Sequence, residues 1–162
     1  MGLDMYLCRK IHIGAQYEFN EIKGDFNIYK AGKKLPLELV DIRDVVQEVG
    51  YWRKANQIHK WFVDNVQNGK DDCADYWVSE EDLEKLLNIC KTIKEKCPLV
   101  DGKVVNGKRF NKETEEWEEI IEDGKIMTNT EIAEELLPSQ EGFFFGSTNY
   151  DQYYYEDILD TI

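Results

Sequence analysis

The sequence lacks any long hydrophobic run and contains only two histidines among its 162 residues. A membrane-spanning helix needs roughly 18 or more consecutive apolar residues, so the sequence predicts no membrane-spanning segment and no membrane partner. The first residues, "MGLDM", also lack the basic and apolar regions of a secretory signal peptide. We therefore expect a protein of the cytoplasm.

Cysteine patterns and catalytic motifs are missing as well. Cys8, Cys73, Cys90 and Cys97 show no Cys-x-x-Cys spacing, which argues against a zinc ribbon or a disulfide framework. Cys90 and Cys97 fall on one helical pattern, which predicts buried thiols. No nucleophile elbow or zinc-protease motif occurs. We expect no metal and no cofactor, and the sequence favours a binding protein over an enzyme.

Positive charge is scarce in the second half of the chain. Residues 1–70 carry 11 Lys and Arg against 9 Asp and Glu, whereas residues 71–162 carry 9 against 24, within a net charge of −13. Contacts to phosphates need clustered Lys and Arg, so this distribution argues against a nucleic-acid binder. It indicates a solvated acidic surface or, alternatively, mimicry of nucleic-acid charge toward a basic partner.

The sequence pattern of the N-terminal third predicts strands and turns. Residues 2–13 alternate apolar and polar positions, which predicts an opening strand. Residues 14–42 are interrupted by Gly14, Gly24, Gly32 and Pro36, which predicts short strands joined by turns. Residues 40–50 fit either a strand or a short helix, because their valines suit both.

Three helices are expected farther along the chain. Apolar residues at helical spacing predict the first from Tyr51 to Gln67, and the second runs from an N-cap at Ser79 to Pro98. A short third helix is capped by Thr130 and ends at Pro138. Between the second and third helices, three Gly-containing turns, "DGK", "NGK" and "DGK", predict a β-arm or meander at 99–129 that inserts into the domain. Together these elements predict a single compact α+β domain, with a small, mostly antiparallel sheet packed against about three helices.

The C-terminal stretch "GFFFGSTNYDQYYYEDILDTI" predicts a buried strand at the phenylalanines, a turn at 146–148 and a final helix. Thr148 or Asn149 is the expected N-cap of that helix. A helix N-terminus also receives anions, so an anion or nucleotide contact there is the alternative. The clustered tyrosines cannot all face the core, so some are expected to meet solvent or a partner.

The densest set of polar candidates lies on the first predicted helix. Arg53, Asn56 and Lys60 fall on one helical face and His59 neighbours it, with Trp52 or Trp61 as a stacking wall for a phosphate or carboxylate ligand. The alternative is a solvated face on which Lys60 pairs with Asp64.

The loop after this helix suggests two further alternatives. His59 with Asp71 or Asp72, or with Cys73 as nucleophile, suggests a hydrolase. Asp71, Asp72 and Asp75 suggest a cation site, although a solvated loop accounts for them as well.

Three segments carry a family resemblance: "MGLDMYL", "YWRKANQIHKWFVDNVQNGKDDC" and "LLPSQEGFFFGSTNYDQYYYED". Together they resemble a family of small acidic proteins encoded by bacteriophages and prophages, with no assigned activity. The resemblance implies a bacterial host cytoplasm and an accessory role, such as blocking a host protein or sequestering a nucleotide signal. It also implies that 99–129 is present only in some members.

Two functional hypotheses follow from these observations. The first is a binding protein that sequesters a small anionic, nucleotide-like ligand between two parts of the chain. The ligand-binding residues would be Trp52, Arg53, Asn56, His59, Lys60, Gly146, Ser147, Thr148 and Tyr150. The second is an acidic inhibitor of a basic host protein. The sequence leaves an assembly of identical copies open.

Overall fold

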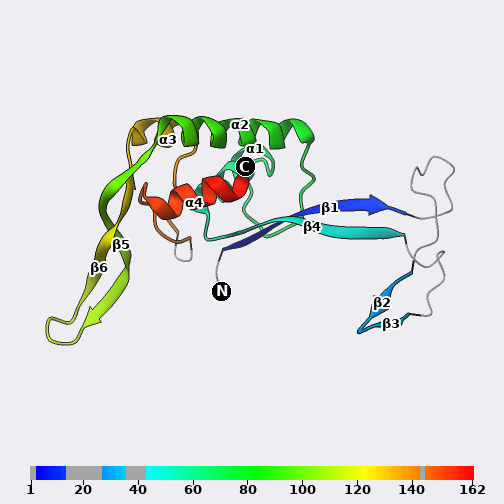
Figure 1. The fold of residues 1–162 in the computed structure, drawn as a ribbon, viewed down its shortest axis with the longest axis horizontal. Coiled ribbons are helices and arrows are strands. Elements are labelled where there is room, and N and C mark those ends of the chain that lie inside the picture. The colour runs from blue at the N-terminus through cyan, green and yellow to red at the C-terminus, as the bar shows by residue number, and fades with distance from the viewer. Residues whose placement is uncertain (1–2, 14–26, 36–42, 143–144) are drawn as a thin grey trace. The chain divides into compact units, whose positions relative to one another are not determined.

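The computed structural model describes residues 3–13, 27–35, 43–142 and 145–162 (Figure 1). This part of the chain contains four helices and two-stranded sheets, which confirms the predicted α+β class. In chain order the elements are β1 (Asp4–His12), β2 (Tyr29–Lys30), β3 (Lys33–Lys34), β4 (Asp44–Arg53), α1 (Asn56–Asn65), α2 (Glu80–Lys96), β5 (Leu99–Asn111), β6 (Glu116–Met127), α3 (Thr130–Leu136) and α4 (Gln152–Thr161).

The chain divides into two compact units. One unit is Tyr6–Tyr51, and the other, called the helical unit below, joins Met1–Met5 to Trp52–Ile162. The helical unit contains all four helices and the β5–β6 pair. The prediction of a single domain stays a prediction.

Strands β1 and β4 pair with each other, which confirms the opening strand and resolves residues 44–50 as strand. The Ile13 N–H donates to the Arg43 carbonyl (2.9 Å) and the Lys54 N–H to the Leu3 carbonyl (2.7 Å), so the two strands run antiparallel. The short β2–β3 hairpin turns at Ala31 and Gly32, both with positive φ. The expected breaks at Gly14, Gly24 and Pro36 lie outside the described residues.

Helix α1 begins at Asn56, so the predicted start at Tyr51 is wrong. Residues 51–53 continue β4, because pairing with β1 overrides a helical spacing that those residues also satisfy. Lys54 then adopts φ +60°, which separates the strand from the helix. Ile58, Trp61 and Phe62 bury the apolar face of α1.

Helix α2 and its cap confirm the prediction. The Ser79 side chain accepts a hydrogen bond from the Asp82 N–H (3.0 Å), and Leu86, Cys90 and Ile93 are buried. Cys90 and Cys97 are buried free thiols as predicted, and burial raises the pKa of Cys90 to about 12.

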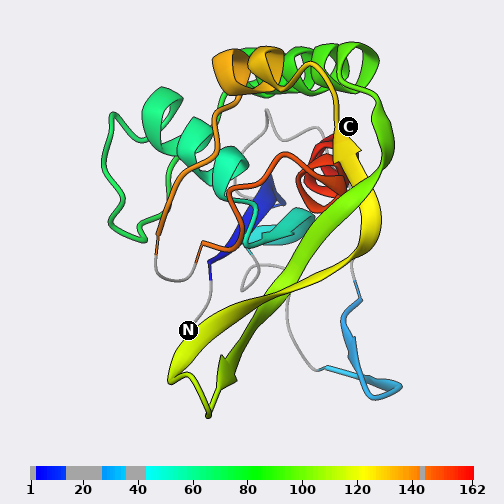
Figure 2. The same cartoon turned by 90° about the vertical axis from the view of Figure 1, so that its left-hand side faces the viewer.

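Helices α3 and α4 lie against α2 (Figures 1 and 2). The buried Tyr154 hydroxyl of α4 donates to the Leu137 carbonyl at the end of α3 (2.7 Å). The N-cap of α3 is Asn129 rather than Thr130, and Asn129 makes no side-chain capping bond. The predicted strand at the phenylalanines falls partly on 143–144, which lie outside the described residues, and Phe145 is not in a strand.

The 99–129 insertion is one long antiparallel hairpin, β5–β6, which we call the arm. The prediction of an arm is confirmed, but the predicted Gly-containing turns are wrong: Gly102 and Gly124 pair with each other inside the strands. A Cβ at Gly102 would lie 2.8 Å from the Ile126 side chain, so glycine permits this close packing. Gly107, with φ +121°, lies in the register shift between Val105 and Lys108. The arm extends away from the helices in both views (Figures 1 and 2).

Candidate functional site

Asn56, a predicted ligand residue, anchors the loop before α4 instead of facing an open cleft. Its side-chain amide donates to the carbonyls of Phe145 (3.1 Å) and Ser147 (2.8 Å), and its oxygen accepts from the Gln140 N–H (2.8 Å). The residue is only 2% exposed. Both donors and the acceptor of the amide are therefore used inside the protein.

Trp52 is also occupied internally. It is buried, and its indole N–H donates to the Thr161 hydroxyl of α4 (2.9 Å). The neighbouring buried Gln57 donates to the Asp157 carboxylate (2.9 Å). Burial raises the pKa of Asp157 to about 6 despite that hydrogen bond, and the nearby Asp160, Glu156 and Asp151 raise it further.

The predicted basic row on α1 does not form. Arg53 belongs to β4 and is exposed, so it does not share a helix face with Asn56 and Lys60. Lys60 pairs with Asp64 one turn later on α1. The solvated-face alternative is therefore the better description of Lys60.

His59 does meet one of its predicted partners. Its Nε2 lies 3.3 Å from the Asp71 carboxylate, and its ring contacts the Phe145 ring edge-on, with 5.2 Å between centroids. His59 is 6% exposed, and its Nδ1 is buried without a hydrogen-bond partner. Cys73 is exposed, and no cluster of three potential metal ligands occurs among the described residues.

The N-terminus of α4 already holds a carboxylate. Asp151 is the N-cap, and its side chain accepts from the N–H groups of Tyr153 (2.9 Å) and Tyr154 (3.5 Å), so the predicted caps Thr148 and Asn149 are wrong. Burial raises the pKa of Asp151. The Ser147 hydroxyl accepts from the Asn149 N–H (3.1 Å) in the preceding loop. The donors that would attract an external anion are thus used by Asp151.

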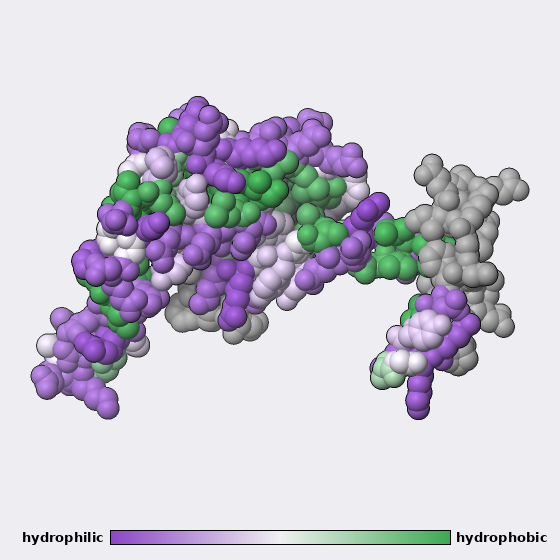
Figure 3. Space-filling model, in the orientation of Figure 1, coloured by the Kyte–Doolittle hydropathy of each residue, from purple (hydrophilic) through white to green (hydrophobic). Residues whose placement is uncertain are grey.

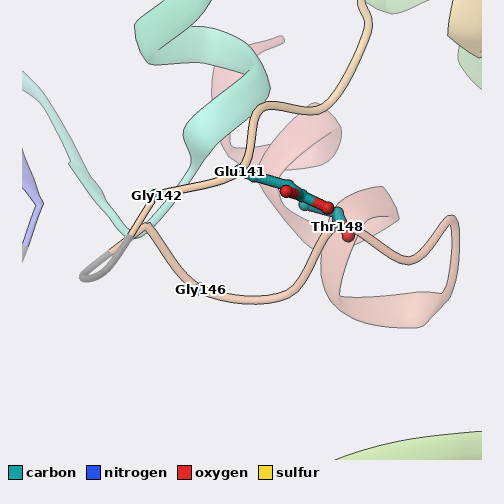
Figure 4. A pocket seen from close by; sticks show the side chains of 4 residues that line it. All are labelled: Glu141, Gly142, Gly146 and Thr148. Carbon is teal, nitrogen blue, oxygen red and sulfur yellow. The ribbon is translucent and has the colours of Figure 1, made fainter.

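A shallow hollow of about 510 Å³ lies within this anchored loop (Figure 4). It is lined by Glu141, Gly142, Gly146 and Thr148, and the Glu141 side chain points toward Thr148. Gly146 has φ +90° and lies against Lys54, where a Cβ would come within 3.1 Å of the Lys54 carbonyl. The structure thus places Gly146 and Thr148 at one hollow with Glu141, which the sequence did not single out.

Tyr150 and the other C-terminal tyrosines divide between structure and surface. The Tyr150 hydroxyl accepts from the Ser139 N–H (3.2 Å), and its ring packs on Tyr154. Tyr154 is buried, whereas Tyr153 is 36% exposed. The expectation that some tyrosines meet solvent is confirmed.

The arm carries a surface that sequence reasoning did not single out. Phe110, Trp117 and Ile121 are 45%, 67% and 61% exposed. The register pairs Phe110 with Trp117 and Val105 with Ile121, so these residues share one face, called the apolar face below, on which the Lys108–Glu119 pair lies between the two apolar pairs. The sequence signal for this surface was the pair of aromatic residues, Phe110 and Trp117, close to the four-residue turn 112–115. Elsewhere the arm is mainly hydrophilic on the side seen in Figure 3.

Comparisons with known proteins give no identification. No family model, no curated protein and no solved structure matches the chain. Within the described residues, no helix is long and apolar enough to span a membrane.

Proposed function

We propose that the chain is a non-enzymatic accessory protein that binds a basic partner protein and blocks it. The observation that carries this proposal is the apolar face of the arm, where Phe110, Trp117 and Ile121 are exposed on a ribbon that projects from the helical unit. Exposed large apolar residues grouped on one face are typical of interaction sites. The family resemblance supplies the setting, a phage-encoded protein acting on a protein of its bacterial host.

The charge of the chain supports a basic partner. Residues 6–51 contain seven Lys and Arg and seven Asp and Glu, so the whole net charge of −13 lies in the helical unit. Charge of one sign steers association with a partner of opposite sign and disfavours association with identical copies. Asn56, His59 and Tyr150 contact other residues of the chain, which supports a surface rather than a deep ligand site.

The test is affinity capture by the full chain from a bacterial lysate, followed by native mass spectrometry. We expect one co-purifying basic protein in a fixed ratio to the chain, released when the salt concentration is raised well above the physiological ~0.15 M. Recovery of the chain alone would contradict the proposal.

A small anionic ligand at the loop hollow is the second candidate function. Its supporting observation is the stem of the Lys54 side chain, which lies beside Gly146, and such a ligand would also meet the Glu141 carboxylate that lines the hollow. A nucleoside diphosphate is a suitable probe. Calorimetric binding that is lost in Gly146→Val but kept in Gly107→Val would support this candidate, whereas absence of heat would contradict it.

A further inference from the structure

We propose that the outer edge of β6, the edge opposite β5, accepts an extended basic segment of the partner as a third strand of the arm. This inference rests on the proposed function and specifies its surface and its partner. It follows from three features of β6: its backbone, its apolar face and its charge.

The backbone of β6 is already paired on its outer edge, but only at the base of the arm. There the Met127 N–H donates to the Tyr150 carbonyl (3.1 Å), the Lys125 N–H donates to the Gln152 side chain (2.9 Å), and Ile126 forms an antiparallel bridge with Asp151. Within the described part of the chain, no segment pairs with this edge from Asp123 to Glu116. The protein thus uses this edge for its own extended segment and leaves the remainder open.

The direction of the open backbone groups follows from the period of a strand. Since the N–H groups of Lys125 and Met127 point outward, those of Asp123, Ile121, Glu119 and Trp117 point outward as well. Ile121 and Trp117 are also the exposed residues of the apolar face. An added strand would therefore gain main-chain hydrogen bonds and apolar contacts from the same residues, as in β-strand addition.

The charge of β6 selects the occupant. Strand β6 contains five carboxylates and one cation, Lys125. The carboxylates are Glu116, Glu118, Glu119, Glu122 and Asp123. A second copy of β6 on this edge would place carboxylates against carboxylates, which is a known protection against edge-to-edge association. A strand bearing Lys or Arg would relieve that repulsion. Three of the β6 carboxylates already pair within the arm: Asp123 with Lys103, Glu119 with Lys108 (3.9 Å) and Glu118 with Arg109 (3.6 Å). Among the ion pairs of the described residues, Glu116 and Glu122 have none, so these two carboxylates are the ones that a basic strand would neutralise.

The probe is a capped peptide of alternating lysine and valine, about nine residues long to match the open edge. Two matched peptides serve as controls: one with glutamate in place of lysine, and one N-methylated at every residue so that it can donate along neither edge. We expect the full chain to bind the first peptide and to bind each control at least about tenfold more weakly. Equal binding of the N-methylated peptide would overturn the inference.

Two variants locate the binding on the chain. Ile121→Pro removes one outward donor, which an edge strand tolerates, and Trp117→Ala removes the largest apolar contact. Both are expected to weaken binding of the lysine peptide at least about tenfold, whereas Ile120→Thr, on the opposite face, retains it. Circular dichroism and thermal unfolding establish that each variant is folded. Unchanged binding in Trp117→Ala would overturn the inference.

The remaining outcomes separate this inference from the proposed function. If a captured host protein stays bound to Ile121→Pro and Trp117→Ala, the proposed function stands and the β6 edge is not its surface. If no protein is captured while the peptide binds at the edge, the proposed function fails and the edge assignment stands. Self-association of the chain that Ile121→Pro abolishes would make a second copy the occupant and overturn the basic-partner assignment.

Discussion

Helix α1 and the arm belong to the same unit but use their side chains in opposite ways. On α1 the polar residues that suggest a ligand site, Asn56 and His59, are buried, and Asn56 is fully hydrogen-bonded inside the protein. On the arm the apolar residues that suggest a core, Trp117 and Ile121, are exposed. Residue type alone therefore does not locate a functional surface. The environment that the fold gives each residue does.

Among the hydrogen-bonded side chains, the largest expected effect concerns Asn56, whose role we interpret as structural. Asn56→Ala leaves the Gln140 N–H and the carbonyls of Phe145 and Ser147 without their partner, so we expect the free energy of unfolding to fall by about 2–4 kcal/mol. Urea denaturation measures this loss.

The matched control is Asn65→Ala on the same helix. Asn65 is exposed, and its side chain donates to the Trp61 carbonyl. We therefore expect Asn65→Ala to lower the free energy of unfolding by no more than about 0.5 kcal/mol. Equal losses in the two variants would show that Asn56 does not anchor the loop.

A second effect tests the link between Trp52 and α4. Thr161→Val removes the acceptor of the indole N–H, which we expect to cost about 1–2 kcal/mol of unfolding free energy. Thr92→Val is the matched control, because both hydroxyls donate to the carbonyl four residues earlier but only that of Thr161 receives the indole. Similar losses in both would indicate that the Trp52 bond contributes nothing.

The sequence predicted the fold class, α2 with its cap, the buried thiols and the existence of the arm. Each of these depends on local signals: apolar periodicity, the Ser79 cap, or strand-forming runs between polar residues. The start of α1 was mispredicted because residues 51–53 satisfy helical spacing, while their strand conformation depends on the start of β1, which is about 45 to 50 residues away in sequence.

The predicted ligand site did not form as expected, because the positions of its residues depend on contacts that no local sequence pattern encodes. The hydrogen bonds of Asn56 reach residues 84 to 91 positions away. The Asp151 cap replaces Thr148 because the chain pairs with the β6 edge at Tyr150 and Asp151, directly before the helix begins. The contact between His59 and Asp71 was anticipated because these residues are close in sequence.

A third prediction concerns pH. Asp157 has a pKa of about 6 in the folded protein, above the ~3.9 of an unfolded aspartate, so the folded state binds the extra proton between these values. Its contribution to stability therefore increases as the pH falls from 7 toward 4. Asp157→Asn keeps an acceptor for Gln57, so the variant should be more stable than the parent at pH 7, and the difference should shrink by pH 4.5.

Urea midpoints of both proteins at the two pH values measure this difference. The subtraction removes the opposite contributions of Asp44 and Asp82, whose pKa values are lowered by hydrogen bonds from His12 and Ser79. Glu84→Gln, an exposed position on α2 that does not influence Asp157, is the control. A difference that does not change with pH would exclude Asp157 as the titrating group.

The smallest expected effect is on the arm and completes the comparison. Trp117→Ala removes a residue that is 67% exposed and contacts Phe110 with 5.5 Å between ring centroids. We expect a loss of less than about 1 kcal/mol, against about 3–5 kcal/mol for Trp52→Ala, where a 7% exposed tryptophan leaves a cavity. Thermal and urea unfolding of both variants measure the two values. A Trp117 loss as large as that of Trp52 would show that the apolar face stabilises the fold, whereas a small loss leaves binding as the reason for exposing it.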